Sequence, residues 1–89
     1  MKSVSEKIEI ALKYFNTGKK EEALKNIEIL LNSDQQNEEL LMLHAKMSLS
    51  LGNITSANFS LFQVLEKNQF NAEALKLIYV NFLKIKNMN

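Results

Sequence analysis

The chain has 89 residues, which is enough for one small domain and too few for two. Hydrophobic residues make up 46% of it and charged residues 24%, a balance that excludes an intrinsically disordered chain and a membrane-embedded one. The net charge of +1 gives no electrostatic reason to expect nucleic acid or an anionic membrane as partner. Because there is no cysteine, disulfides and thiolate chemistry are excluded as well.

The first ten residues contain Glu6 and Glu9 where a secretory signal peptide would need an uninterrupted apolar segment. No run of apolar residues approaches the length that spans a bilayer. We therefore expect a cytoplasmic protein with no membrane partner, as the default for a chain without a targeting signal.

The first predicted helix covers residues 4–16. Ser3 followed by Glu6 is typical of a capping box, in which each residue accepts a backbone N–H of the other. Apolar residues then recur at helical spacing. Gly18 is expected to end the helix, because it adopts the left-handed conformation without steric cost.

Four further helices are expected over residues 20–32, 38–51, 55–67 and 72–86. Asn37 is expected to cap the third of them, and Gly52 to close it. No proline occurs, and apolar and polar residues do not alternate long enough to indicate a strand. The fold class predicted by these patterns is all-α, with five helices.

A period of 34 residues relates the parts of the chain. It separates Gly18 from Gly52 and Ala23 from Ala57, and a third copy of the turn is expected to open at Lys86. A fixed period of this size indicates repeated supersecondary units. The units expected are a first repeat over about residues 4–37, a second over 38–71 and a partial third over 72–89.

Helix–turn–helix units with this period resemble the tetratricopeptide repeat (TPR) family. The positions where the two helices of a repeat pack in that family hold Ile10, Ala11, Tyr14, Ala23, Ile27 and Leu30, then Leu41, His44, Ala45, Ser48, Ala57, Leu61 and Val64, and lastly Leu75, Ile78, Tyr79 and Phe82. Ser48 and Tyr79 depart from the residue sizes usual at their places. The resemblance implies a right-handed α-solenoid of about two and a half repeats. The alternative is an ordinary helical bundle with a coincidental spacing.

The resemblance also implies a partner-binding groove lined by the first helix of each repeat. The groove residues carried over are Ile8, Leu12, Phe15, Met42, Lys46, Leu49, Lys76, Val80 and Leu83. The places where chaperone-tail binders clamp a carboxylate hold Ile8, Leu12, Leu43, Glu73 and Leu77, none of which can donate to a carboxylate. An apolar groove with lysine margins favours a protein partner that presents an amphipathic helix or peptide. The alternative is that some of these side chains pack between neighbouring helices.

The predicted helix over 72–86 is apolar on nearly all sides, although the terminal helix of a repeat array is expected to be polar on its outer face. Two explanations stay open: a fragment of a longer array, or a homodimer formed through this helix. The residues expected to mediate self-association are Leu77, Tyr79, Val80, Leu83 and Ile85. The second candidate function is accordingly a structural self-assembly segment.

His44 is the only histidine, and it falls at a packing position with no second histidine, cysteine or nearby acid expected beside it. A buried, hydrogen-bonded imidazole is therefore favoured over a metal ligand or a catalytic base. The adjacent acid pairs Glu21–Glu22 and Glu38–Glu39 do not face each other on a helix and form no catalytic dyad. We expect no enzyme activity, no metal and no cofactor.

Overall fold

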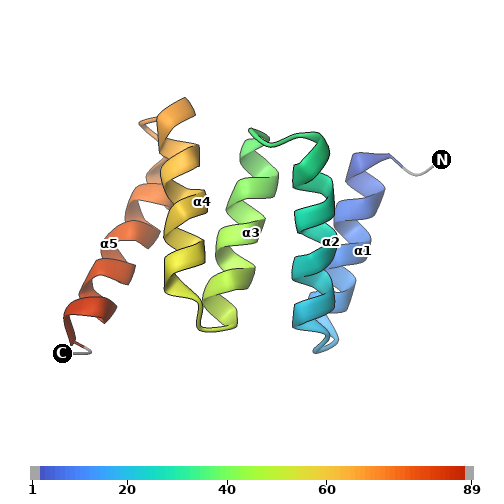
Figure 1. The fold of residues 1–89 in the computed structure, drawn as a ribbon, viewed down its shortest axis with the longest axis horizontal. Helices are drawn as coiled ribbons and strands as arrows, with labels where there is room; N and C mark the ends of the chain where they lie inside the picture. The colour runs from blue at the N-terminus through green and yellow to red at the C-terminus, as the bar shows by residue number, and fades with distance from the viewer. Residues whose placement is uncertain (1–2, 88–89) are drawn as a thin grey trace.

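A computed structural model describes residues 3–87, and over this range the chain is an array of five α-helices with no strand. The helices are α1 (Val4–Asn16), α2 (Lys20–Ser33), α3 (Glu38–Ser50), α4 (Ile54–Lys67) and α5 (Ala72–Asn87). Consecutive helices run antiparallel, and each packs on the next in the chain (Figure 1). The array measures 46 × 29 × 18 Å. The predicted all-α class is confirmed.

Local capping determines where these helices begin. The Ser3 hydroxyl accepts the N–H of Glu6 at 3.2 Å, and the Glu6 carboxylate accepts the N–H of Ser3 at 3.4 Å, so the predicted capping box is present. Asn37 caps α3 as expected. Asparagines at the same place before α4 and α5, Asn53 and Asn71, each accept a backbone N–H of the first turn.

Glycine turns end α1 and α3. Gly18 and Gly52 have φ angles of 93° and 82°, in the left-handed region that other residues adopt only at a cost. The matching position after α5 is Lys86, where the sequence predicts the opening of a third turn. That prediction is wrong over the described residues, because the helix continues through Asn87. Lysine has a Cβ atom and favours helix, so it does not supply the turn that glycine supplies. The rest of the predicted turn, residues 88–89, lies outside the described residues.

Two apolar clusters form the core, one at each pair of helices. The first consists of Ile8, Ala11, Ala23, Ile27, Leu40 and Met47, and the second of Leu41, Met42, Ala45, Ala57, Leu61, Val64 and Ala74. Ala23 and Ala57 are both fully buried. Their small side chains let α2 approach α1 closely, and α4 approach α3 in the same way.

The junction between α4 and α5 is polar where the junction between α2 and α3 is apolar. Asn81 is fully buried, and its Nδ2 donates to Oδ1 of Asn58 at 2.8 Å. Thirty-four residues earlier the same two positions hold Leu24 and Met47, which belong to the first apolar cluster. The Oδ1 atom of Asn81 has no hydrogen-bond partner among the described residues. The attachment of α5 therefore includes a half-satisfied buried amide, which weakens it.

Truncation of the buried residues Ile27 and Leu61 tests the core. Ile27→Ala and Leu61→Ala should each lower the free energy of unfolding by about 2–5 kcal/mol, because each leaves a cavity beside a helix crossing. Urea denaturation followed by circular dichroism measures this loss. Ile29→Ala, at an exposed position of the same helix as Ile27, is the control and should change stability by less than about 0.5 kcal/mol. Equal losses for Ile27→Ala and Ile29→Ala would contradict the core assignment.

Replacing Asn58 and Asn81 by the apolar residues found at the α2–α3 junction tests how the amide pair affects stability. The double variant Asn58→Leu with Asn81→Met should be at least as stable as the natural chain, because both polar groups leave the buried junction together. Asn81→Met alone should cost about 1 kcal/mol, since it leaves the Asn58 amide without its partner. Thermal unfolding compares the three chains, and a double variant less stable than the single one would show that the amide pair strengthens the junction.

Candidate interaction surface

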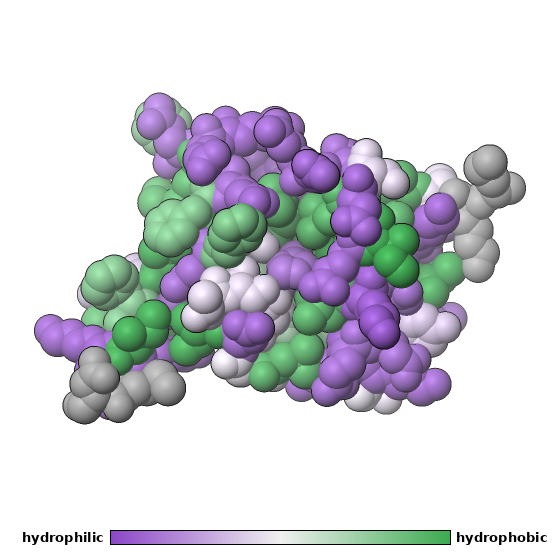
Figure 2. All heavy atoms as spheres, in the orientation of Figure 1, coloured by the Kyte–Doolittle hydropathy of each residue, from purple (hydrophilic) through white to green (hydrophobic). Residues whose placement is uncertain are grey.

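Exposed apolar side chains concentrate on the second half of the array. Figure 2 shows hydrophobic residues gathered over α4 and α5 and mainly hydrophilic ones over α2. The exposed large apolar residues of this half are Phe59, Phe62, Phe70, Leu75, Tyr79, Phe82, Leu83 and Ile85, whereas the first half exposes Val4, Tyr14 and Ile29. A contiguous apolar surface of this kind marks a site of interaction with another molecule.

Four residues of α5 form one stripe of this surface, which we call the open face. They are Leu75, Ile78, Tyr79 and Phe82. Their spacing places them on one side of the helix over two turns. Leu75, Tyr79 and Phe82 are 49%, 65% and 71% exposed. The open face therefore offers a helical stripe with two large aromatic rings to solvent.

The repeat register explains why Leu75, Tyr79 and Phe82 are exposed, whereas Ile78 is half-buried and packs against the second apolar cluster. The residues 34 positions earlier, on α3, are Leu41, His44, Ala45 and Ser48, and all four are buried. Leu41 and Ala45 share an apolar cluster with residues of α4, and His44 hydrogen-bonds to α4. On α3 the equivalent surface is covered by α4. On α5 no described helix covers it.

Among the described residues, the outer face of the opposite end of the array is polar. The outer face of α1 holds Glu6, Glu9 and Lys13, which are exposed, and the matching positions of α3 hold Leu40, Leu43 and Met47. A polar outer face is what a terminal helix of a stacked array needs to remain in water. One end of the array is therefore compatible with solvent, while the other is apolar.

The predicted groove residues divide into two groups. The structure buries Ile8 in the first apolar cluster and Met42 in the second, so the alternative of packing between helices holds for these two residues. Leu12, Phe15 and Leu49 are partly exposed but pack against the same clusters. Sequence periodicity identifies an apolar stripe but not which part of it the neighbouring helices cover.

The predicted lysine margin of the groove is partly engaged within the chain. Lys46 forms an ion pair with Glu73 at 2.8 Å, which links α3 to α5. Lys20 lies over the Phe15 ring at 5.5 Å and donates to the Ser50 hydroxyl at 2.8 Å. These contacts cover part of the predicted row.

The α5 end of the predicted groove remains accessible. Lys76 and Leu83 are exposed there, and Val80 is half-buried. Because Leu83 lies one helical turn after Tyr79, this end of the row borders the open face.

The predicted self-association residues also differ in accessibility. Tyr79, Leu83 and Ile85 are exposed, while Leu77 packs against the second apolar cluster. Burial of Leu77 follows from the register, because the matching position of α3, Leu43, packs against the preceding pair in the same way. The exposed members lie on or beside the open face.

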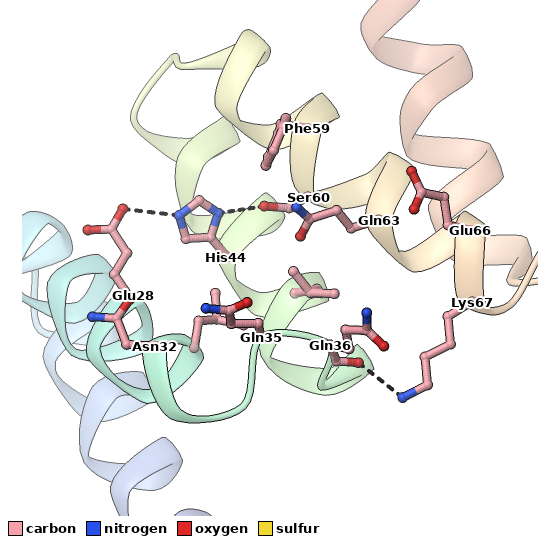
Figure 3. A pocket seen from close by; sticks show the side chains of 12 residues that line it. Glu28, Asn32, Gln35, Gln36, His44, Phe59, Ser60, Gln63, Glu66 and Lys67 are labelled. Atoms are coloured by element: carbon pink, nitrogen blue, oxygen red, sulfur yellow. Dashed lines mark hydrogen bonds and ion pairs between the residues drawn. The ribbon is translucent and has the colours of Figure 1, made fainter.

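A hollow of about 800 Å³ lies between α2, α3 and α4 and is mainly polar (Figure 3). His44 sits in its wall, with Nδ1 2.8 Å from the Ser60 hydroxyl and Nε2 3.1 Å from the Glu28 carboxylate. The buried, hydrogen-bonded histidine expected from the sequence is confirmed. The expectation of no nearby acid is wrong, because the antiparallel packing of α2 on α3 brings Glu28 beside the ring.

The order carboxylate, imidazole and hydroxyl also occurs in nucleophilic catalysis, but here the groups act as a structural link. An ionised Glu28 only accepts hydrogen bonds, so Nε2 of His44 donates to it. Ser60 is 3% exposed, so its hydroxyl lies within the packed interior. Its hydroxyl and His44 instead tie three helices together.

The comparisons with known proteins found no relative. The chain matches no protein-family model, no curated protein and no solved structure. Among the described residues, no cluster of histidines and acids could hold a metal ion. No helix within residues 3–87 is long and apolar enough to cross a membrane.

Removal of the imidazole tests the structural role of His44. His44→Leu should lower the free energy of unfolding by about 1–3 kcal/mol, because it leaves the buried Ser60 hydroxyl without a partner. The double variant His44→Leu with Ser60→Ala should regain most of that loss, as measured by urea denaturation. Glu28→Gln should cost less than about 1 kcal/mol, since Glu28 is exposed. Full stability of His44→Leu alone would contradict this role.

Proposed function

We propose that this chain is a protein-interaction module, built as a right-handed TPR-like solenoid, that binds another protein through the open face of α5. The burial of equivalent repeat positions supports this proposal. The positions that α4 covers on α3 are uncovered 34 residues later on α5. An exposed stripe with Tyr79 and Phe82 has the composition of an interface centre, in which large aromatic residues supply most of the binding energy.

The open face replaces the predicted groove as the main contact in this proposal. Burial of Ile8 and Met42 removes two of the expected groove anchors, and the Lys46–Glu73 ion pair occupies part of its margin. Leu83, at the accessible end of the row, extends the open face along α5. The partner expected from the sequence, a protein that presents an amphipathic helix or peptide, is retained.

Homodimerisation is the second candidate function, and the exposure of Tyr79, Leu83 and Ile85 favours it. The two candidates use overlapping surfaces but differ in the occupant. Sedimentation velocity over a range of protein concentrations separates them, because a homodimer changes mass with concentration and a module that waits for another protein does not.

A pair of lysine substitutions tests the module. A photo-crosslinking residue at Phe82 should identify a partner in extracts, which is then purified and its Kd measured against the natural chain. Phe82→Lys should weaken that Kd by at least about tenfold, because an apolar contact at the centre of the interface is replaced by a charge. Glu9→Lys, on the polar outer face of α1, should leave the Kd unchanged. Equal affinities for both variants, with unchanged helicity, would refute binding through the open face.

A further inference from the structure

We infer that the occupant of the open face is a helix of a partner protein that runs antiparallel to α5 and carries carboxylates in its first turn. This inference rests on the proposed function and adds the geometry and charge of the partner. It is based on the packing of the two complete helix pairs and on the distribution of charge on α5. It is also based on the residue of α5 that stands at the repeat position where α1 and α3 are followed by glycine.

The geometry of the occupant follows from the covered positions. On α3 the element over the equivalent stripe is the antiparallel helix α4, and α2 packs antiparallel on α1 (Figure 1). Of the equivalent positions on α1, only Ala11 is buried, while Lys7 and Tyr14 are exposed. Leu75, Tyr79 and Phe82 form a ridge along one side of α5, and such ridges pack into the grooves of another helix. A helix laid along an apolar stripe is also an established mode of partner recognition.

The residue at the turn position distinguishes α5 from α1 and α3. The chain folds back after α1 and α3 at glycines with positive φ, Gly18 and Gly52. The corresponding residue after α5 is Lys86, which is helical, as is Asn87. The chain thus does not fold back onto the open face at the position where the two complete pairs do.

Residue size restricts the face of the partner helix. In the complete pairs, Ala11 and Ala23 are fully buried in one cluster, and Ala45 and Ala57 are fully buried in the other. Tyr79 stands in the register of Ala11 and Ala45, so α5 offers a large ring where its equivalents offer a methyl group. A partner helix reaches the usual interaxial distance of about 8–10 Å only if it places a small residue opposite Tyr79.

The charges on α5 restrict which residues the partner helix can carry at its ends. Lys86 lies one turn after Phe82 on the same side of α5, and Lys76 flanks Tyr79; both are exposed. The single acid of α5, Glu73, pairs with Lys46 of α3. An antiparallel helix begins near the C-terminal end of α5, so carboxylates in its first turn would meet Lys86 and also suit their own helix dipole. α2 has this arrangement, with Glu21 and Glu22 directly before Ala23.

A second copy of the chain fits these requirements less well. The buried apolar residues of α1 to α4 are engaged in the two clusters, so we consider a symmetric pair in which α5 faces α5. Both sides of that pair would then present Lys76 and Lys86, with no carboxylate between them. A partner with an acidic first turn supplies the missing charge.

The segment Lys19–Asp34 of this chain is a suitable probe, because it is a covering helix with an acidic first turn. As a labelled synthetic peptide, cross-linked between positions 25 and 29 on its outer side to make it helical, it should bind the natural protein in a fluorescence-anisotropy titration. A matched peptide with Glu21→Lys and Glu22→Lys should bind about fivefold more weakly at low salt, and the difference should shrink as salt screens the pairs. A third peptide with Ala23→Phe should also bind more weakly.

Two protein variants localise the binding. Phe82→Lys should abolish binding of the acidic peptide, while Lys13→Glu, on the outer face of α1, should leave it unchanged. Binding that survives Phe82→Lys, or no binding of any peptide, overturns the inference of a partner helix on this face. Equal binding of the acidic and charge-reversed peptides overturns the acidic first turn alone and leaves the proposed function intact. A concentration-dependent dimer that dissociates in the Phe82→Lys variant would show that the occupant of the open face is a second copy of the chain and not a partner protein.

Discussion

The close approach of paired helices at two alanine crossings is the constraint on which the array depends. Ala11 and Ala23 share one apolar cluster, Ala45 and Ala57 share the other, and all four are fully buried. Small residues at a crossing shorten the distance between helix axes, and a larger side chain would force the axes apart. The flanking larger residues, such as Ile27 and Leu61, then reach the core. The apolar stripe of each first helix is thereby covered by the second helix of its pair.

α5 packs on the helix before it, but no described helix packs on its other side. Its inner side packs on α4 through Ala74 and the amide pair of Asn58 and Asn81. Its other side, with Tyr79 at the alanine position, stays in water. The same register that buries the helix pairs thus produces the apolar surface assigned here to a partner.

Much of this organisation can be predicted from the sequence, because the signals involved are local. The Ser3–Glu6 box, the Asn37 cap and the glycines of the two turns locate helix ends to within about one residue. The helix from 72 was also predicted, but its continuation past Lys86 was not, since the register suggested a turn that lysine does not make.

The candidate surface was harder to predict. Hydrophobic periodicity shows that a helix has an apolar side, yet Ile8 and Met42 are buried while Tyr79 and Phe82 are exposed, and all four belong to such stripes. Only the order of the helices in space decides which stripe is covered. The contact of Glu28 with His44 was missed for the same reason, because antiparallel packing brings together two residues that are 16 positions apart.

The unlike ends of the array restrict how it can assemble. Head-to-tail growth into a filament requires one end of a molecule to complement the other end of the next. Here the α1 end presents Glu6, Glu9 and Lys13, and the α5 end presents Leu75, Tyr79 and Phe82, so stacking one on the other would bury charges against aromatic rings. The two described ends of the array are thus poorly matched for head-to-tail stacking, even though one of them carries an uncovered apolar surface.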